Sequence, residues 1–298
     1  MDSHRMRKGE LEVEVAAQGA ELQRLRFRGL DLLWEGGPLW PRRAPLLFPI
    51  VGALGKGGLR HQGRSFPLPK HGFARDRTFT WIERTPEGCV LELTEDDATR
   101  AAYPFAFRLR VAFRLQGDSL RSDLILANRC GEPLPASLGG HPAFRWPLGP
   151  GLPKAAHRVV FAEPEPEPIR RLTAEGLLDP EPRPTPVAGR VLALREELFE
   201  ADALIFDRLR SRSLRFEADG GPALAFSWEG FPHFGIWTRP EPGPAFLCLE
   251  PWQGFASPVG WDGEFLDKPG VVVLAPGQHR TWSYTVTALP QGRGTQSW

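Results

Sequence analysis

Glycine and proline interrupt this chain so often that long helices are excluded. The 298 residues include 32 glycines and 31 prolines, about a fifth of the chain. Few segments run for three helical turns without one of these residues, and both destabilise a helix interior. Ten tryptophans and 19 phenylalanines accompany them, and aromatic residues are enriched in strands. We therefore expect many short strands joined by turns.

Alternation of apolar and polar residues predicts the individual strands. It is clear in 11–17 (LEVEVAA), in 21–28 and in 89–94. The segment 107–128 predicts a hairpin, because two alternating runs flank a QGDS turn. Further strands are expected at 32–34, 77–84, 203–206, 213–217, 223–228, 234–237, 245–249, 271–274 and 281–287, the last two as a closing hairpin.

Helices are expected only as a short helical turn at 95–103 and as one or two turns at 194–200. Because strands do not alternate with helices, we expect an all-β fold: a large antiparallel β-sandwich with few short helices, in one domain over residues 1–298. The apolar segment 40–52 holds three prolines, which suits loop and strand ends near a site. The proline-rich segment 163–186 is expected to be an irregular surface loop, and whether it covers a pocket stays open.

The charge balance gives no reason to expect nucleic acid or a membrane as partner. Lys and Arg number 37, Asp and Glu 36, and the net charge is +1. Three widely spaced cysteines form neither a disulfide framework nor a metal-binding pair. The first ten residues lack the apolar stretch of a signal peptide and are expected to be disordered. No apolar run approaches a membrane span. These features predict a cytoplasmic protein.

Three polar residues follow strand-like segments in contexts that present a side chain. His71 lies in LPKHGFARDRT, His141 in SLGGHPAFRWPL and Glu250 in LCLEPWQGFASP. Turns rich in glycine and proline place side chains at strand ends, where functional residues concentrate. A fourth residue, His233, lies among aromatic residues and is a further candidate for a pocket wall.

Several kinds of site fit His71, His141 and Glu250. A two-histidine, one-carboxylate metal site commonly draws two ligands from one short motif, and no such motif occurs here. A glycosidase needs a second carboxylate, for which Asp202 and Asp76 are candidates. Proton transfer between one acid and one base needs only a histidine and a carboxylate. The residues also fit a purely structural role, with Glu250 paired to an arginine such as Arg75.

Five segments in order resemble the aldose 1-epimerase (galactose mutarotase-like) family, in its bacterial branch of aldose 1-epimerase-like proteins. They are APLLFPIVG, LPKHGFARDR, GGHPAF, DALIF and LEPWQG, and the resemblance covers nearly the whole chain. It implies a large antiparallel β-sandwich and a carbohydrate mutarotase, an isomerase that interconverts the α and β anomers of an aldohexose. It also implies a sugar as partner, no cofactor, no metal, and a monomer or homodimer.

The resemblance assigns roles to individual residues. His141 corresponds to the histidine that protonates the ring oxygen, and Glu250 to the glutamate that takes the anomeric hydroxyl proton. His71 corresponds to a second histidine that binds the sugar, and Asp202 to an aspartate that binds its hydroxyls. Many relatives have an arginine where this chain has Ala53. Arg43 and Arg75 are the candidates to replace it, and Arg75 is taken as a binding group.

Three alternatives remain open at this point. A hexose-6-phosphate mutarotase needs an arginine cluster at the pocket mouth, which Arg42, Arg43, Arg75 and Arg77 would supply. A non-catalytic sugar-binding protein would have the same fold, and a metal-dependent enzyme would lose its activity to a chelator. The aromatic residues near the site fit either stacking on a sugar or core packing; they are Trp252, Phe73, Phe144 and Trp146.

Overall fold

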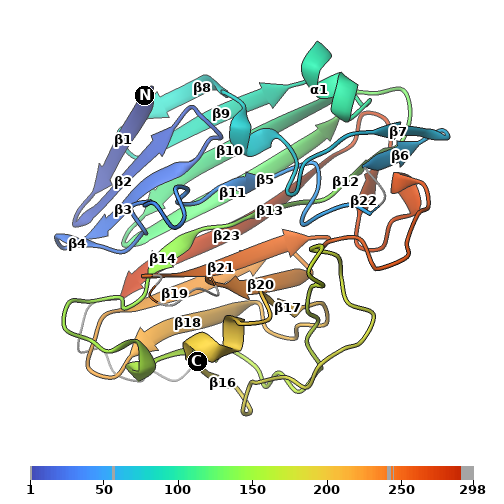
Figure 1. Ribbon diagram of the computed structural model, residues 1–298. Coiled ribbons are helices and arrows are strands. Elements are labelled where there is room, and N and C mark those ends of the chain that lie inside the picture. Colours follow the sequence, from blue (N-terminus) through green and yellow to red (C-terminus); the bar gives the residue numbers. More distant parts are fainter. Residues whose placement is uncertain (1, 56–57, 240–242, 244, 290–298) are drawn as a thin grey trace.

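The chain forms layers of antiparallel sheet, as the sequence predicts (Figure 1). The computed structural model describes residues 2–55, 58–239, 243 and 245–289. The largest sheet has nine strands in the order β16-β15-β18-β19-β23-β11-β10-β9-β8. Their bounds are β8 Thr80–Thr85, β9 Gly88–Thr94, β10 Phe107–Gln116, β11 Ser119–Asn128, β15 His157–Phe161, β16 Val191–Ala193, β18 Ser213–Ala218, β19 Ala223–Glu229 and β23 His279–Leu289.

A six-stranded sheet lies in front of the nine-stranded one and carries the site (Figure 1). Its order is β17-β20-β21-β13-β5, and β14 also pairs with β21. The bounds are β5 Leu46–Leu47, β13 Leu138–Gly140, β14 Ala143–Arg145, β17 Leu204–Phe206, β20 His233–Trp237 and β21 Phe246–Gln253.

A four-stranded sheet, β1-β2-β3-β4, lies beside it over the end of the large sheet that holds β8 to β10 (Figure 1). Two two-stranded sheets, β6-β7 and β12-β22, and short helices complete the described fold. The bounds are β1 Ser3–Lys8, β2 Leu11–Ala16, β3 Leu22–Phe27, β4 Leu30–Asp31, β6 Leu59–His61, β7 Arg64–Phe66, β12 Leu134–Ala136, β22 Val272–Leu274, the α-helix α1 Asp97–Ala102, and the 3-10 helices η1 Ala74–Asp76, η2 Lys154–Ala156, η3 Glu196–Phe199 and η4 Phe265–Asp267.

The main core lies between the layers and follows the period-two pattern of the strands. In β23 the alternate residues Trp282, Tyr284 and Val286 are buried in it. They meet Leu247 and Leu249, which the six-stranded sheet contributes from β21 to the same cluster. Burying apolar area in this way stabilises the sandwich by about 25 cal/mol for each Å² removed from water.

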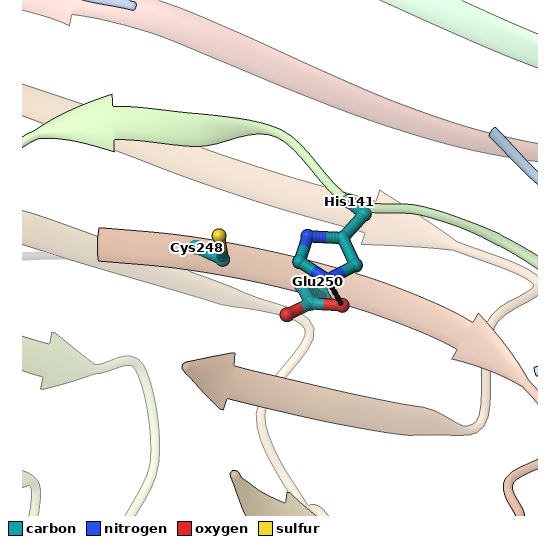
Figure 2. Close-up of side chains that lie close together, drawn as sticks. All are labelled: His141, Cys248 and Glu250. Carbon is teal, nitrogen blue, oxygen red and sulfur yellow. Dashed lines mark ion pairs between the residues drawn. The ribbon is translucent and has the colours of Figure 1, made fainter. Parts of the chain in front are cut away.

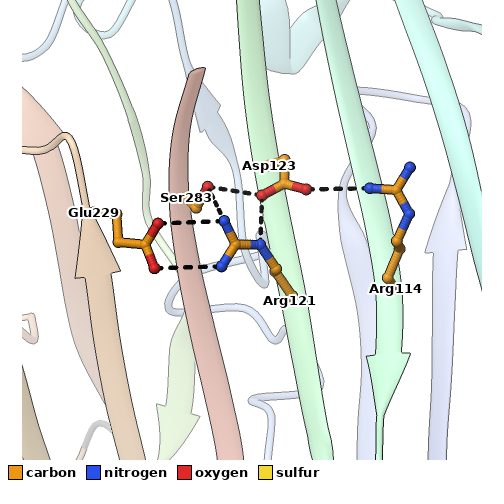
Figure 3. Close-up of polar contacts among 5 residues, drawn as sticks. All are labelled: Arg114, Arg121, Asp123, Glu229 and Ser283. Carbon is orange, nitrogen blue, oxygen red and sulfur yellow. Dashed lines mark hydrogen bonds and ion pairs between the residues drawn. The ribbon is translucent and has the colours of Figure 1, made fainter.

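The other face of the nine-stranded sheet is polar, and a network of charges ties its strands together (Figure 3). Asp123 on β11 accepts hydrogen bonds from Arg114, Arg121 and Ser283, at 3.3, 2.8 and 2.7 Å. Arg121 also donates to both carboxylate oxygens of Glu229 on β19, each at 3.4 Å. Because one charge cluster spans β10, β11, β23 and β19, it links the middle of the sheet across its polar face.

Strand β21 is apolar along most of its length because both of its faces are covered. Leu247 and Leu249 point into the main core, whereas the alternate residues Phe246, Cys248 and Trp252 belong to smaller clusters on the opposite face. Glu250 shares that opposite face by the same alternation. A carboxylate inside an apolar strand is therefore presented away from the sandwich core and toward the site.

Three sequence predictions differ from the structure. The N-terminal residues are ordered: β1 pairs with β2 from Ser3 to Lys8, although its sequence HRMRK lacks apolar alternation. The closing hairpin does not form, because β22 pairs with β12 while β23 lies between β11 and β19. The turn between β22 and β23 resembles a hairpin turn, but the two strands belong to different sheets. The expected strand at 32–34 is also displaced, to β4 at Leu30–Asp31.

Candidate active site

A pocket of about 220 Å³ opens on the outer face of the six-stranded sheet. All five predicted site residues line it. Glu250 lies on β21, His141 between β13 and β14, and Asp202 before β17. His71 and Arg75 both come from the connection between β7 and β8, with Arg75 in η1. The remaining lining residues are Trp40, Pro45, Val51, Gly52, Lys70, Leu172, Ala203, Ile205, Trp237, Trp252 and Ala256. The segment 40–52 therefore lies at the site, as its prolines suggested.

Glu250 and His141 face each other because two short strands pair with β21 on either side of the histidine. Gly139 on β13 pairs with Trp252, and Ala143 on β14 pairs with Cys248. The link between β13 and β14 carries His141 and therefore lies opposite Glu250. Nε2 of His141 is 3.2 Å from Oε2 of Glu250 (Figure 2). The Glu250 side chain is 1% exposed and that of His141 9%.

Burial shifts the pKa values of Glu250 and His141 in opposite directions, because a dry environment disfavours the charged form of each group. Burial raises the pKa of Glu250 well above its usual value, and the negative charge of Asp202 raises it further. Burial lowers the pKa of His141 to about 3, and the charges of Arg75 and Lys70 act in the same direction. Both shifts favour the uncharged forms, a protonated Glu250 and a neutral imidazole.

His71 is fixed by two hydrogen bonds to one residue of the 40–52 segment. Its backbone N–H donates to the carbonyl of Gly52 at 2.9 Å, and the N–H of Gly52 donates to Nδ1 of His71 at 3.2 Å. Burial and the nearby His141 lower the pKa of His71 well below its usual value. A neutral ring that accepts at Nδ1 carries its proton on Nε2. His71 thus offers the pocket an N–H donor.

Asp202 lies at the end of the turn between η3 and β17. Its backbone has a φ of +64°, a left-handed conformation that aspartate adopts more readily than most residues. Its Oδ1 accepts from the N–H of Ala203 at 2.8 Å, which leaves Oδ2 as an acceptor for a ligand. Arg171 donates to the carbonyl of Asp202 at 2.8 Å. The neighbouring Leu172 lines the pocket, so the proline-rich segment forms part of the pocket wall.

Arg75 is the arginine that reaches the pocket, and Arg43 does not. Arg75 Nη2 donates to the carbonyl of Lys70 at 2.7 Å, whereas Arg43 Nη1 donates to Gln23 at 2.5 Å, away from the lining residues. Arg42 pairs with Asp76 and Arg77 pairs with Asp96. Arg42 Nη1 also donates to the carbonyl of Arg75 at 3.3 Å, but of the four arginines only Arg75 is among the residues that line the pocket. Because Asp76 does not line the pocket, it is no partner for Glu250.

The aromatic walls are mostly residues that the sequence did not single out. Trp40 and Trp237 flank His141, with ring centroids at 5.3 and 5.6 Å from its ring. Trp252 lines the pocket as expected. Its indole ring lies over a neighbouring glycine, since a Cβ at Gly139 would fall 2.6 Å from its Cδ1. The other candidates, Phe73, Phe144 and Trp146, pack in or against the main core.

The sequence analysis did not identify two further residues near the site, although the sequence position of each gave a weak indication. Lys70 precedes His71 and lines the pocket. Cys248 lies two residues before Glu250, a spacing that puts both on one face of a strand. A donor atom from each of His141, Cys248 and Glu250 lies within 4.8 Å of the others, so these three are the candidate metal ligands among the described residues. His233 is buried but does not line the pocket; its Nδ1 accepts from Gly254 at 3.1 Å.

The layered antiparallel sheets form a β-sandwich of the galactose mutarotase-like class. The chain is a member of the aldose 1-epimerase family. The model of that family matches residues 2–285. The resemblance that the five segments suggested is thereby confirmed. Membership supports a mutarotase-like isomerase acting on a carbohydrate. Among the described residues, no helix is long and apolar enough to cross a membrane.

Particular relatives extend over almost the whole chain. Protein LacX of Lactococcus lactis subsp. lactis is 31% identical over 291 residues, which are 94% of this chain and 97% of the relative. A galactose mutarotase related enzyme from Lactobacillus acidophilus is 27% identical, with a TM-score of 0.89 over 99% of this chain and 100% of that one. A galactose mutarotase-like protein from Lactobacillus casei shares the fold, at 23% identity and a TM-score of 0.89 over 96% of this chain and 100% of that one.

Proposed function

We propose that this chain is a carbohydrate mutarotase that interconverts α and β anomers of an aldohexose by ring opening and closure. In this proposal Glu250 is the base and His141 the acid, and no cofactor or metal takes part. The observation that carries it is the buried contact of 3.2 Å between His141 Nε2 and Glu250 Oε2 at a pocket large enough for one sugar. Family membership supports the same reaction class.

The spacing of the two groups suits this chemistry. Anomer exchange removes a proton from the hydroxyl on C1 and adds one to the ring oxygen, which is bonded to the same carbon. An acid and a base must therefore reach two oxygens that are separated by a single carbon atom. A contacting carboxylate and imidazole meet that condition. Glycosidases instead hold two carboxyl groups about 5–10 Å apart around the scissile bond.

The pair needs one titratable proton, shared between Glu250 and His141, for the complete cycle. In the reactive form Glu250 is ionised and His141 protonated; this has the same net charge as the resting pair. Glu250 takes the proton of the C1 hydroxyl while His141 gives its proton to the ring oxygen, and the C1–O5 bond breaks to leave an open-chain aldehyde. Rotation about C1–C2 turns the other face of the aldehyde toward the ring hydroxyl. The same two transfers in reverse close the ring and restore the pair.

The remaining lining residues suit a single sugar. The pocket of about 220 Å³ is below the roughly 300–1,000 Å³ of sites for drug-sized ligands, which favours one sugar ring over an oligosaccharide. Nε2–H of His71 and the free oxygen of Asp202 supply a donor and an acceptor for hydroxyl groups. Trp40, Trp237 and Trp252 supply apolar faces for the C–H surface of a pyranose.

Polarimetry tests the proposal. Freshly dissolved α-D-glucose and α-D-galactose are followed with and without protein, in the presence of a chelator. We expect faster relaxation to the same final rotation for at least one sugar. Binding of these sugars without any acceleration would contradict the proposal and favour a non-catalytic sugar-binding protein.

A second candidate substrate, an anionic sugar such as a hexose 6-phosphate, is favoured by one observation. Lys70 and Arg75 place two cations among the residues that line the pocket, and both groups bind phosphate well in proteins. The same polarimetric assay with glucose 6-phosphate separates the two substrates. A higher kcat/KM for the phosphorylated sugar, lowered by Lys70→Met, would favour this candidate.

A further inference from the structure

Next to the proposed acid–base pair lies a free thiol that the reaction does not use. Cys248 is fully buried and is a free cysteine. It projects from β21 on the same face as Glu250, and Figure 2 shows both side chains on this strand with the His141 ring next to the carboxylate. A sulfur, a ring nitrogen and a carboxylate oxygen lie within 4.8 Å of one another.

From this arrangement we propose that His141, Cys248 and Glu250 form a binding site for a thiophilic divalent cation, with Zn²⁺ as the reference ion, and that the bound ion inhibits the enzyme. This inference rests on the proposed function for its effect on activity, but not for the binding itself. Zinc takes thiolate, imidazole and carboxylate ligands in tetrahedral sites. Here the fourth position would face the pocket, where a water molecule or a sugar hydroxyl can occupy it.

Oε2 of Glu250, a proposed ligand atom, has no hydrogen-bond partner of good geometry among the described residues. Nδ1 of His141 has none either, so the ring can carry its proton on Nδ1 and ligate the ion through Nε2. His141 is 7% exposed and Glu250 1%. Buried polar atoms without a partner are costly, so a ligand that satisfies Oε2 of Glu250 gains more than it would at a solvated site.

The separations require only a modest adjustment. Zn–N and Zn–S bonds of about 2.0–2.3 Å hold neighbouring ligand atoms between about 3 and 4 Å apart. The nitrogen-to-oxygen distance of 3.2 Å is already in this range. The thiol must move inward by a rotamer change or a small strand shift, because the limit on the three separations is 4.8 Å.

Binding has a definite proton balance. The Cys248 sulfur and a Glu250 oxygen each form a bond to the ion, and the thiol and carboxyl protons are released to solvent. The two resulting negative charges neutralise the ion, while the charges of Lys70 and Arg75 oppose it. Inhibition follows because the ion withdraws charge from a coordinated Glu250, which makes it a much weaker base for the C1 hydroxyl proton, and coordinated His141 carries no proton at the bound nitrogen.

Calorimetric titration with ZnCl₂ in buffers of different ionisation enthalpy tests the site directly. We expect one ion per chain, with proton release. Cys248→Ser and Cys248→Ala should weaken binding by about tenfold or more, as losses at metal sites commonly do. Cys130→Ser is the matched control, because its thiol is also free but lies far along the chain from the pocket and bonds to Ala106. Equal Zn²⁺ affinity in wild type and both Cys248 variants would overturn the proposal.

Substituting Co²⁺ gives a second readout that is independent of activity. A thiolate ligand produces a sulfur-to-metal absorption band, which should be present in wild type and in Cys130→Ser and absent from both Cys248 variants. A band retained without Cys248 would overturn the site. In the activity assay, Zn²⁺ should slow anomer exchange in wild type but not in a folded Cys248→Ser protein. If a chelator instead abolishes activity and Zn²⁺ restores it, the site stands and the metal-free mechanism of the proposed function fails.

Discussion

At the scale of single residues, burial controls the behaviour of the proposed acid–base pair more than charge does. The charge of Lys70 lowers the pKa of Glu250, yet burial outweighs it and raises that pKa. A carboxyl group that keeps its proton near neutrality is a better partner for proton transfer at physiological pH. Burial therefore favours the uncharged forms of both groups in the resting pair.

The role of His71 can be separated from its effect on the fold. His71→Asn is suited to this because asparagine tolerates the left-handed backbone, here with φ of +68°. Its side-chain oxygen can still accept from Gly52, but the Nε2–H donor is lost. We expect KM for the sugar to rise by about tenfold, the value of one neutral hydrogen bond, with a smaller change in kcat. Measured kcat and KM check this, and an unchanged KM would exclude His71 as a donor to the sugar.

The sequence predicted the members of the site better than their protonation. Short motifs identified His71, His141 and Glu250, whereas the pairing of β13 and β14 with β21 brings His141 opposite Glu250. The low pKa of His141 could not be predicted, since it depends on Trp40 and Trp237 closing over the ring. Trp40 and Trp237 are distant from each other in sequence, and only the folded sheet makes them neighbours.

At the scale of elements, the proline-rich segment 163–186 supports the site, which its composition does not predict. Ile169 and Arg183 form a two-stranded bridge, and Arg170 bridges to Ile205 on β17. The adjacent Arg171 donates to the carbonyls of Leu198, Asp202 and Ala203, at 2.8, 2.8 and 3.2 Å. One guanidinium therefore holds the turn that presents Asp202 to the pocket.

Replacing Arg171 should misplace Asp202 without removing it. We expect Arg171→Met to lower kcat/KM by about 10–100-fold, because small displacements of a binding group are costly. Arg171→Lys should recover part of the loss by bonding one or two of the three carbonyls. Arg183→Met is the control, since Arg183 lies in the same segment but forms exposed pairs with Asp179 and Glu181. Steady-state kinetics measure these changes in kcat/KM. An equal loss of kcat/KM in Arg183→Met would contradict a specific role of Arg171 and show a general effect on the segment.

Elements with a repeating pattern were predicted well, and those fixed by distant partners were not. The hairpin β10–β11 and the strands β18 and β19 follow from alternation and turns, and β21 from its continuous apolar run. Strand β1 has no such pattern and is fixed by pairing with β2, while Arg7 N–H also bonds to the carbonyl of Pro86 at 3.0 Å. Strands β22 and β23 are adjacent in sequence, but burial of Trp282 in the main core places β23 in the large sheet.

At the scale of the whole molecule, one continuous apolar cluster extends from Met6 to Ala288. This continuity supports the proposal that residues 1–298 form one domain. Inside the fold a buried histidine away from the pocket links stability to pH. Burial lowers the pKa of His233 to about 4, and the charges of Lys268 and Arg212 contribute.

This shift predicts a loss of stability in acid. Because the folded pKa is below the unfolded value of about 6.5, only the unfolded chain takes up this proton as the pH falls from 6.5 toward 4, and folding is disfavoured. Between pH 6.5 and 5 His233 should contribute a loss of about 2 kcal/mol in the free energy of unfolding. Urea denaturation at several pH values measures it. His233→Gln should reduce the slope, exposed His279→Gln should not, and identical slopes in all three proteins would refute the assignment.

The central claim concerns Glu250, and polarimetry of Glu250→Gln tests it most directly. The variant keeps the size of the side chain but cannot take a proton from the C1 hydroxyl. Wild type, Glu250→Gln and the control Glu200→Gln, at an exposed position, are compared on a freshly dissolved α-anomer that wild type converts. We predict that Glu250→Gln loses at least about 10²–10⁴-fold in rate, with an unchanged circular dichroism spectrum, while Glu200→Gln stays active. A fully active Glu250→Gln protein would contradict the account.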